Sequence, residues 1–268
     1  HLYINGFYWG LYNPVERPAD LEELPEPPWE ELRKRIKPLR DPVRRLKDLG
    51  YWVTMEGKGA FESAWMLLRG LEEIWYDIAD DPGFVKRMSE RALDSVVRLG
   101  LMVAEECDLD AIWITDDMGT QHAPYFSPET FRNIFREPAR AMVNAFHRAG
   151  LKVTYHSHGN VTALFGDLVE IGYDSIDPLD SYDGMDLKTL KQRYGGDTVL
   201  KGGISCTIAG MSRDQLREHI QTVARTGGNE RFILSGAGGV PPEMKVGDFN
   251  YYRELVSRAR RNEPLPRT

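Results

Sequence analysis

From about residue 50 onward, a short β-rich run that ends in glycine or a polar residue is followed, again and again, by a helical stretch. Six such runs are legible, at residues 51–57, 111–117, 152–158, 174–180, 198–205 and 231–239. Strands that alternate with helices predict parallel β-structure joined by right-handed crossovers. This feature restricts the chain to the α/β class, either as an open doubly wound sheet or as a barrel.

The helices between these runs have recognisable start signals. Asp81-Pro82 and Ser127-Pro128 place a capping residue directly before proline, which is favoured at the first helical position. Ser212 and Gln215 have the spacing of a capping box. Pro138 lies inside the second of these helices, where its missing N–H is expected to cause a kink.

Polar residues favour the barrel over the open sheet. No Gly-x-Gly-x-x-Gly phosphate loop follows the first run, as a dinucleotide-binding sheet would require. Polar side chains instead gather at the C-terminal ends of the runs, where a (β/α)8 barrel builds its active site. They are Glu56, Asp116, Asp117, His156, His158, Asp177, Asp180, Ser205 and Cys206. We predict an α/β fold, a (β/α)8 TIM-type barrel, as a single domain over residues 1–268.

Residues 1–30 differ from the rest of the chain. Aromatic residues alternate around Asn5-Gly6, which predicts a hairpin, and a proline-broken surface connection follows. Six runs leave a barrel short of eight strands. Either the hairpin is appended to the barrel, or the chain lacks the first barrel strand.

Charge and hydropathy exclude several classes of protein. The net charge is −7 and the pI is about 5.5, so we expect no nucleic-acid partner, because such binding needs a basic surface. No run approaches the ~20 apolar residues of a membrane helix, and no signal segment is seen. We therefore expect a cytoplasmic protein without membrane contact. Cys107 and Cys206 are the only cysteines, which is no disulfide framework.

Two histidines end the third run. His156 and His158 are two residues apart, so they share one face of a strand, while Tyr155 and Ser157 share the other. If the first face points inward, two imidazoles converge at the barrel mouth, where they suit a metal or an anionic substrate. The alternative without function is that both merely bond to loop carbonyls.

The second run is followed by adjacent acids. Asp116 and Asp117 point to opposite sides, so one acid can face the barrel centre as a base or ligand while its neighbour braces the loop. Gln121 and His122 follow within five residues and are predicted to bind substrate. For His122, a place on the outer loop surface is an equal alternative.

Glycines and a cysteine mark the last two runs. Gly202 and Gly203 allow a backbone or ligand to approach closely, and Cys206 follows, where a thiolate could complete a metal site. A small buried residue is the alternative for Cys206. Residues 236–239 carry almost no side chains, and we expect Gly238 and Gly239 to cradle a ligand through their backbone.

These stretches together resemble a known family. In order, "AFESAWMLLRG", "DDMGTQHAPYFSPETF", "GLKVTYHSHGN", "LVEIGYDSIDPLD", "LKGGIS" and "FILSGAGGVPPE" resemble the uroporphyrinogen decarboxylase superfamily, which includes cobalamin-dependent methyltransferases. The likeness runs from about Tyr51 to the C-terminus, and it is strongest to a branch whose second motif reads Asp-Asp-Leu-Gly-Thr-Gln. The resemblance implies a (β/α)8 barrel.

The methyltransferase branch implies zinc and a corrinoid. Its His-x-Cys-Gly motif and a later cysteine hold zinc, and the methyl group travels through a corrinoid carried by a partner protein. Here the motif reads His156-Ser157-His158-Gly159, and the later cysteine falls at about Gly238. A metal on His156 and His158 would then need Asp116, Asp117, Cys206 or His122 as a third ligand. The resemblance also implies a small methyl donor or acceptor as substrate.

The decarboxylase branch implies a different site. Its N-terminal arginine motif is not seen in this sequence, its tyrosine falls near Met66, and its late histidine falls near Gly238. Three hypotheses remain. The first is metal-assisted methyl transfer, with His156, Asp116 or Asp117 as catalytic groups. The second is a metal-free lyase acting on a carboxylated tetrapyrrole or smaller acid with the same groups as acid and base. The third is a corrinoid or tetrapyrrole binding protein without turnover.

Overall fold

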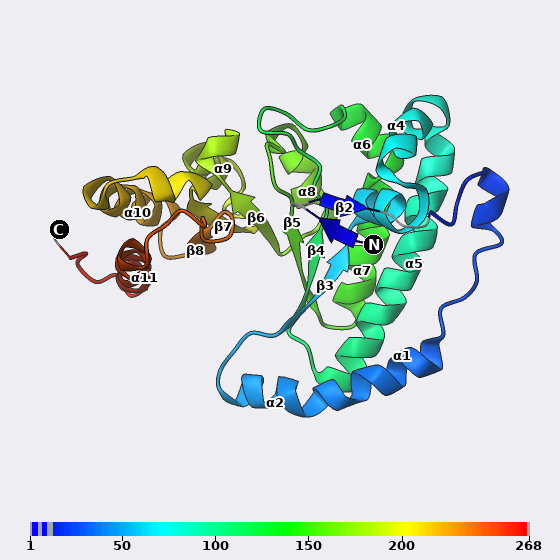
Figure 1. Ribbon diagram of the computed structural model, residues 1–268, viewed down its shortest axis with the longest axis horizontal. Coiled ribbons are helices and arrows are strands. Elements are labelled where there is room, and N and C mark those ends of the chain that lie inside the picture. The colour runs from blue at the N-terminus through cyan, green and yellow to red at the C-terminus, as the bar shows by residue number, and fades with distance from the viewer. Residues whose placement is uncertain (1, 5–6, 10–12, 267–268) are drawn as a thin grey trace. The chain divides into compact units, whose positions relative to one another are not determined.

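The computed structural model describes residues 2–4, 7–9 and 13–266, with side chains from residue 13 onward, and it is an α/β structure (Figure 1). Six parallel strands alternate with helices, and each falls on one of the six predicted runs, although the first strand ends one residue past its run, at Lys58. This confirms the α/β class. The strands are β3 (Thr54–Lys58), β4 (Ala111–Thr115), β5 (Lys152–His156), β6 (Ser175–Leu179), β7 (Val199–Ile204) and β8 (Phe232–Gly236). They follow one another in chain order, and closure into a barrel stays a prediction.

The predicted N-terminal hairpin stays a prediction, because its turn at Asn5-Gly6 lies outside the described residues. Strands β1 (Leu2–Ile4) and β2 (Phe7–Trp9) pair antiparallel, with Leu2 opposite Trp9. After these strands, the proline-broken connection leads to the first helices. The helices are α1 (Trp29–Ile36), α2 (Arg40–Asp48), α3 (Ala60–Glu62), α4 (Leu71–Asp80), α5 (Pro82–Cys107), α6 (Pro128–Ile134), α7 (Arg136–Arg148), α8 (Phe165–Ile171), α9 (Leu187–Tyr194), α10 (Arg213–Gly227) and α11 (Val246–Arg260). None of the helices in the described ranges is both long and apolar enough to cross a membrane.

The chain divides into two compact units, which are described in turn. The first comprises residues 1–117, 126–155 and 170–173. The second comprises residues 118–125, 156–169 and 174–268. The expectation of a single barrel domain over residues 1–268 stays a prediction.

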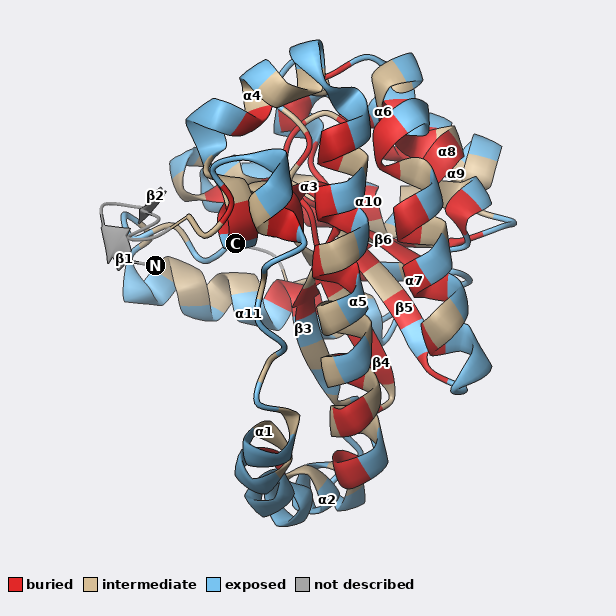
Figure 2. Cartoon of the chain, turned by 90° about the vertical axis from the view of Figure 1, so that its right-hand side faces the viewer, coloured by how far each residue is buried: buried red, intermediate tan, exposed pale blue. Residues whose placement is uncertain are grey.

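Helix α5 organises the core of the first unit. It begins as predicted, with the Asp81 carboxylate accepting from Phe84 N–H and Pro82 in the first position. It packs against α7, and a Cβ at Gly100 would lie 2.7 Å from Phe146 Cε1, so only glycine allows this approach. Figure 2 shows buried residues along β4 and on α5. The core is therefore built where the amphipathic faces of these helices meet the strands.

The kink predicted at Pro138 is a break between two helices. Helix α6 ends at Ile134 and α7 begins at Arg136. Pro138 has no N–H to donate to the carbonyl of Ile134, four residues earlier, which is where the first helix stops. Ser127 caps α6 by accepting from Thr130 N–H, as predicted.

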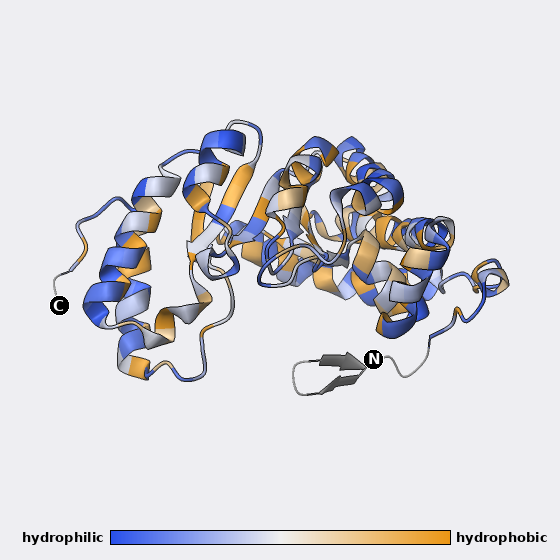
Figure 3. Cartoon of the chain, turned by 90° about the horizontal axis from the view of Figure 1, so that it is seen from above, coloured by the Kyte–Doolittle hydropathy of each residue, from blue (hydrophilic) through white to orange (hydrophobic). Residues whose placement is uncertain are grey.

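The second unit contains β6, β7 and β8 with α9, α10 and α11. Ser212 and Gln215 form the predicted capping box at the start of α10, which packs against β7. Gly203 on β7 has φ of +88°, and a Cβ there would lie 2.4 Å from Val223 Cγ1 of α10. Close packing of strand and helix thus explains Gly203. Figure 3 shows hydrophilic and hydrophobic residues mixed along the helices, as amphipathic helices require.

Asp116, directly after β4, is a fully buried carboxylate in the first unit. Its oxygens accept from the backbone N–H of Glu62 at 2.8 Å and of Phe61 at 3.4 Å, where α3 begins. Burial raises the pKa of the Asp116 carboxyl well above its usual range. The hydrogen bond from the Glu62 N–H lowers this pKa, whereas the negative charge of the Glu62 side chain raises it further. Asp116 is thus the acid that braces the loop, one of the two roles predicted for the pair.

The raised pKa predicts a pH-dependent stability. A carboxyl whose pKa is higher in the folded state binds more protons there, so its contribution to stability falls as the pH rises above about 4. Asp116→Asn keeps an acceptor oxygen but cannot ionise. The free energy of unfolding of Asp116→Asn minus that of the wild type should therefore increase with pH, by at most about 1.4 kcal/mol per pH unit. Urea unfolding over a pH series measures this difference. Asp248→Asn, which changes an exposed acid, is the control, and parallel curves for wild type and Asp116→Asn would refute the account.

Candidate functional site

The two histidines lie side by side in the second unit. The rings of His156 and His158 are stacked, with centroids 5.7 Å apart and planes inclined by 24°. Both side chains are partly exposed, whereas Tyr155 and Ser157 are buried, so the alternation predicted for this run is confirmed. The strand period therefore brings two imidazoles to the C-terminal end of β5.

A buried aspartate lies beside His156. Asp177 Oδ2 is 3.4 Å from His156 Nδ1 and 3.0 Å from Lys201 Nζ. The Asp177 side chain is 6% exposed, that of His156 20% and that of Lys201 32%, so the carboxylate is enclosed and its two partners reach solvent. Burial alone would raise the pKa of Asp177, but the His156 hydrogen bond and the Lys201 charge outweigh it and the pKa is lowered. Asp177 is therefore ionised at neutral pH.

His158 is held by a backbone carbonyl. Its Nε2 donates to the Ala237 oxygen at 2.7 Å, because a carbonyl can only accept. This is the bond that the alternative without function expected for strand-end histidines. His156 differs from His158, because its ring contacts the buried carboxylate of Asp177.

Cys206 lies near His158, around Gly238. A Cβ at Gly238 would be 3.9 Å from Cys206 Cβ and 3.9 Å from His158 Cε1. The Cys206 N–H donates to Asp180 Oδ2 at 2.9 Å. Burial, with added effect from Asp180, raises the pKa of the Cys206 thiol to about 11, so the thiol is protonated at neutral pH.

The remaining predicted residues have varied surroundings. Asp117 belongs to the first unit and is half-buried. Gln121 and His122 are exposed on a loop of the second unit, where Gln121 Nε2 donates to the Tyr182 carbonyl at 3.4 Å. A Cβ at Gly239 would meet nothing within 4 Å, so the space beside it is open. These residues stay candidates for substrate binding.

His156, Asp177 and Lys201 form a hydrogen-bonded network at the strand ends. Two of these residues were not predicted as site residues from the sequence. Asp177 was recognised only as one polar strand end among several, and Lys201 was not singled out at all. A lysine within the otherwise apolar and glycine-rich "VLKGGI" of β7 was the available signal. The first unit has its own polar strand end, in which Lys58 Nζ lies 2.8 Å from Thr115 Oγ1 and 3.3 Å from Glu62 Oε2.

Zinc is the metal that the family resemblance implied for this site. Within residues 2–4, 7–9 and 13–266, no three His, Cys, Asp or Glu side chains are arranged so that they could hold a metal ion. The donor chemistry of His156, His158 and Cys206 suits zinc, and both imidazoles are oriented through one ring nitrogen, as metal-binding histidines usually are. The ligand types and the orientation of the two rings therefore suit zinc, but no third ligand is in position among the described residues.

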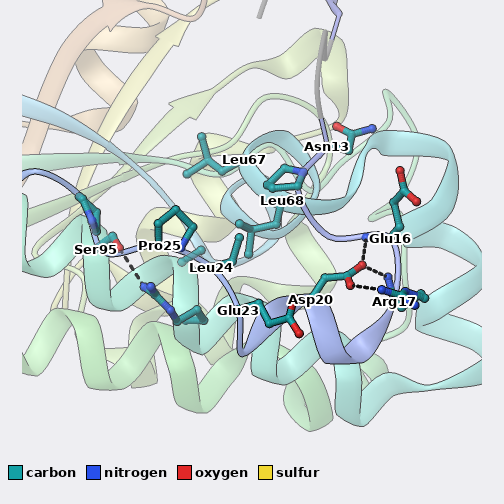
Figure 4. A pocket seen from close by; sticks show the side chains of 14 residues that line it. Asn13, Glu16, Arg17, Asp20, Glu23, Leu24, Pro25, Leu67, Leu68 and Ser95 are labelled. Atoms are coloured by element: carbon teal, nitrogen blue, oxygen red, sulfur yellow. Dashed lines mark hydrogen bonds and ion pairs between the residues drawn. The ribbon is translucent and has the colours of Figure 1, made fainter.

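A cavity of about 640 Å³ lies in the first unit, and none of its lining residues is a predicted site residue (Figure 4). The N-terminal connection covers one side of it, and Leu67, Leu68 and residues of α5 line the other. Asp20 closes the connection by accepting from the backbone N–H of Glu16 and Arg17. Arg17 of the lining pairs with Asp20 at 2.9 Å, and Arg91 pairs with Glu26 at 3.4 Å. The strand ends of the second unit instead hold a buried carboxylate, Asp177, and are the better candidate for chemistry.

One solved structure shows a similar fold. The chain is similar to a methyltransferase from Methanosarcina mazei, with 17% identity, a TM-score of 0.66, and coverage of 86% of this chain and 63% of that one. It thus spans less than two thirds of that protein, and at this identity the likeness concerns the fold alone. A sugar phosphate isomerase/epimerase from Parabacteroides distasonis matches at 12% identity over 77% of this chain and 90% of that one, but its TM-score of 0.38 carries no argument. No curated protein matches the chain.

The family is established by the sequence. The model of the uroporphyrinogen decarboxylase (URO-D) family matches residues 10–259, which is nearly the whole chain. This range includes both histidines, Asp177, Lys201 and the glycine-rich end of β8. The chain belongs to the uroporphyrinogen decarboxylase family.

Proposed function

We propose that the chain is a methyl-transfer enzyme of this superfamily, working on a small molecule at the strand ends of the second unit. The observation that carries the proposal is the oriented histidine pair, with His156 held by Asp177 and His158 by the Ala237 carbonyl. A thiol or hydroxyl acceptor must lose its proton before it can attack a methyl group. Where no metal occupies the other ring nitrogen, an imidazole fixed by a carboxylate is suited to take that proton.

Zinc is the predicted cofactor, with His156 and His158 as the residues that would hold it and Cys206 as a candidate third ligand. Bound there, it would act as a Lewis acid that lowers the pKa of the acceptor. Support comes from Gly238, the approximate position of the family's later cysteine, because a side chain at that position would lie beside both His158 and Cys206. A Cys206 thiolate would offer sulfur to the same region from the end of β7. Asp117 stays a proposed ligand or base, and a corrinoid protein the proposed partner.

Metal binding tests the ligand assignment. His156→Ala, His158→Ala and Cys206→Ala should each weaken zinc binding by more than about tenfold, since loss of an outer partner alone often costs that much. Gly238→Cys should tighten it by adding a thiolate beside His158. Zinc content after dialysis against a competing chelator measures both effects, and His147→Ala, an exposed histidine of the first unit, is the control. Unchanged zinc in His156→Ala and His158→Ala would end the assignment.

A metal-free lyase is the second candidate, and the Asp177 network favours it. His156 and Lys201 are two cationic or hydrogen-bonding groups on one carboxylate, and both are partly exposed. Such groups can bind a substrate carboxylate and move a proton without a metal.

The two candidates separate in a chelator-treated sample. If the lyase reading holds, turnover of a carboxylated tetrapyrrole should persist after zinc is removed and be lost in His156→Gln. If methyl transfer is zinc-assisted, chelation should abolish methylation of a thiol acceptor by a methylcorrinoid, and added zinc should restore it. Tight corrinoid or tetrapyrrole capture without turnover in either assay would point to the third hypothesis, a binding protein.

A further inference from the structure

We propose that helix α2 of the first unit docks onto the outer face of α4 in a second copy of this chain, and that the second copy's α2 makes the same contact in return. Such a reciprocal contact closes a dimer with two-fold symmetry. Neither helix carries a predicted site residue, so the inference is independent of the proposed function.

Helix α2 turns its leucines toward solvent. Leu39 directly precedes the helix, Leu46 lies within it and Leu49 directly follows it, and their spacing of seven and three residues places them on one face. Their exposed fractions are 50%, 43% and 74%. Tyr51 and Trp52, which follow in the chain, are each 62% exposed. Single exposed apolar residues are common, but five in so short a stretch indicate an interaction surface.

The charged side of α2 holds the helix on the protein. Arg40 Nη2 lies 2.6 Å from Glu106 Oε2, in the last turn of α5. Lys47 Nζ lies 3.2 Å from Asp108 Oδ2, directly after α5. Arg40 and Lys47 are seven residues apart, so they share a face, and it is not the face of the leucines. A surface helix normally buries its apolar stripe. In α2 the stripe is exposed instead, as expected where a partner covers it.

Charge restricts the partner to an acidic surface. Residues 33–47 include eight Lys and Arg against one acid. The side chains of Arg35 and Arg44 are 74% and 69% exposed, and Lys37 and Arg45 are exposed as well. Two such basic surfaces repel each other, so α2 does not fit against α2 of a second copy. The whole chain carries −7, so the remainder of the same chain is strongly acidic.

Helix α4 supplies a matching acidic face. Its ten residues include four acids and no basic residue. Glu72, Glu73 and Asp80 are exposed, and the helical period places them around Tyr76, which is 61% exposed. The face of α4 therefore has an aromatic centre and an acidic rim, whereas that of α2 has a leucine stripe and a basic rim. Apolar centres with rims of opposite charge are complementary.

The two surfaces lie at opposite ends of α5 (Figure 2). Asp81 ends α4 and caps the first turn of α5, whereas Glu106 and Asp108, which hold α2, lie at its other end. Helix α5 has 26 residues, so its ends are about 39 Å apart. Two copies with antiparallel α5 helices bring each α2 to the α4 of the other copy. The dimer therefore makes the same contact twice.

An anionic membrane surface is the rival partner for a basic helix with exposed leucines and tryptophan. The second copy is favoured because its acidic counterpart is present on the same chain, in the position that two-fold symmetry requires. The net charge of −7 also opposes binding to an anionic surface.

Charge reversal with complementation tests the proposal. Arg44→Glu with Arg45→Glu makes the α2 surface acidic, and Glu72→Lys with Glu73→Lys makes the α4 surface basic. Sedimentation velocity of the full chain over a concentration series should show a dimer for the wild type. Each double variant alone should raise the dissociation constant by more than about tenfold, because both contacts become repulsive. An equimolar mixture of the two variants should restore the dimer, since each contact then joins opposite charges.

Lys188→Glu with Arg225→Glu is the matched control, because it reverses two exposed basic residues of the second unit and should leave the dissociation constant unchanged. Leu49→Ser should weaken the dimer without loss of helical circular dichroism. If a charge variant loses that signal, Leu49→Ser decides alone.

A wild type that sediments as a monomer at every concentration would overturn the inference. A dimer that neither charge variant weakens, or that the mixture of variants does not restore, would overturn it too. A monomer that floats with anionic vesicles, and stops doing so in Arg44→Glu with Arg45→Glu, would assign α2 to a membrane surface instead. None of these outcomes involves zinc or turnover, so the proposed function and this inference can fail separately.

Discussion

A carboxylate removed from water must be matched by donors, and two buried aspartates in this chain are matched in different ways. Asp116 receives backbone N–H groups at the start of a helix, and burial still raises its pKa. Asp177 receives an ammonium and an imidazole, and its pKa is lowered. Backbone N–H donors hold a loop in place. Side-chain donors that reach solvent can also contact a substrate. Because of this contrast, we regard Asp177, His156 and Lys201 as the stronger candidate site, whereas the catalytic role of Asp116 stays a prediction.

Much of the fold could be predicted from the sequence, because the signals that define it are local. All six strands, the caps at Asp81, Ser127 and Ser212, and the pairing of His156 with His158 on one face depend on spacing within a few residues. The strands are shorter than the predicted runs, because the apolar pattern continues into the loops that carry the polar ends.

The rest depends on contacts between strands and helices. Asp177 and Lys201 are 24 residues apart, and they meet through a shift in strand register that no local pattern encodes. Gly203 was expected to allow the close approach of a backbone or ligand, and only the structure shows that Val223 of α10 approaches it. The same limit applies to the acids after β4, where spacing predicted that one braces the loop and only the contacts showed that it is Asp116.

Family membership and local chemistry together narrow the function. Where the methyltransferase branch has a cysteine, this chain has His158, and where it has a later cysteine, the chain has Gly238 beside Cys206. Histidine in place of sulfur makes a harder, nitrogen-rich site, which still suits zinc. The central claim is that the oriented histidine pair of the second unit is the reactive centre. A crystal soaked in zinc and measured at the zinc absorption edge tests it most directly. The account predicts an anomalous peak within about 2.0–2.1 Å of a ring nitrogen of His156 or His158, and zinc bound only elsewhere, with both rings still hydrogen-bonded to Asp177 and Ala237, would contradict it.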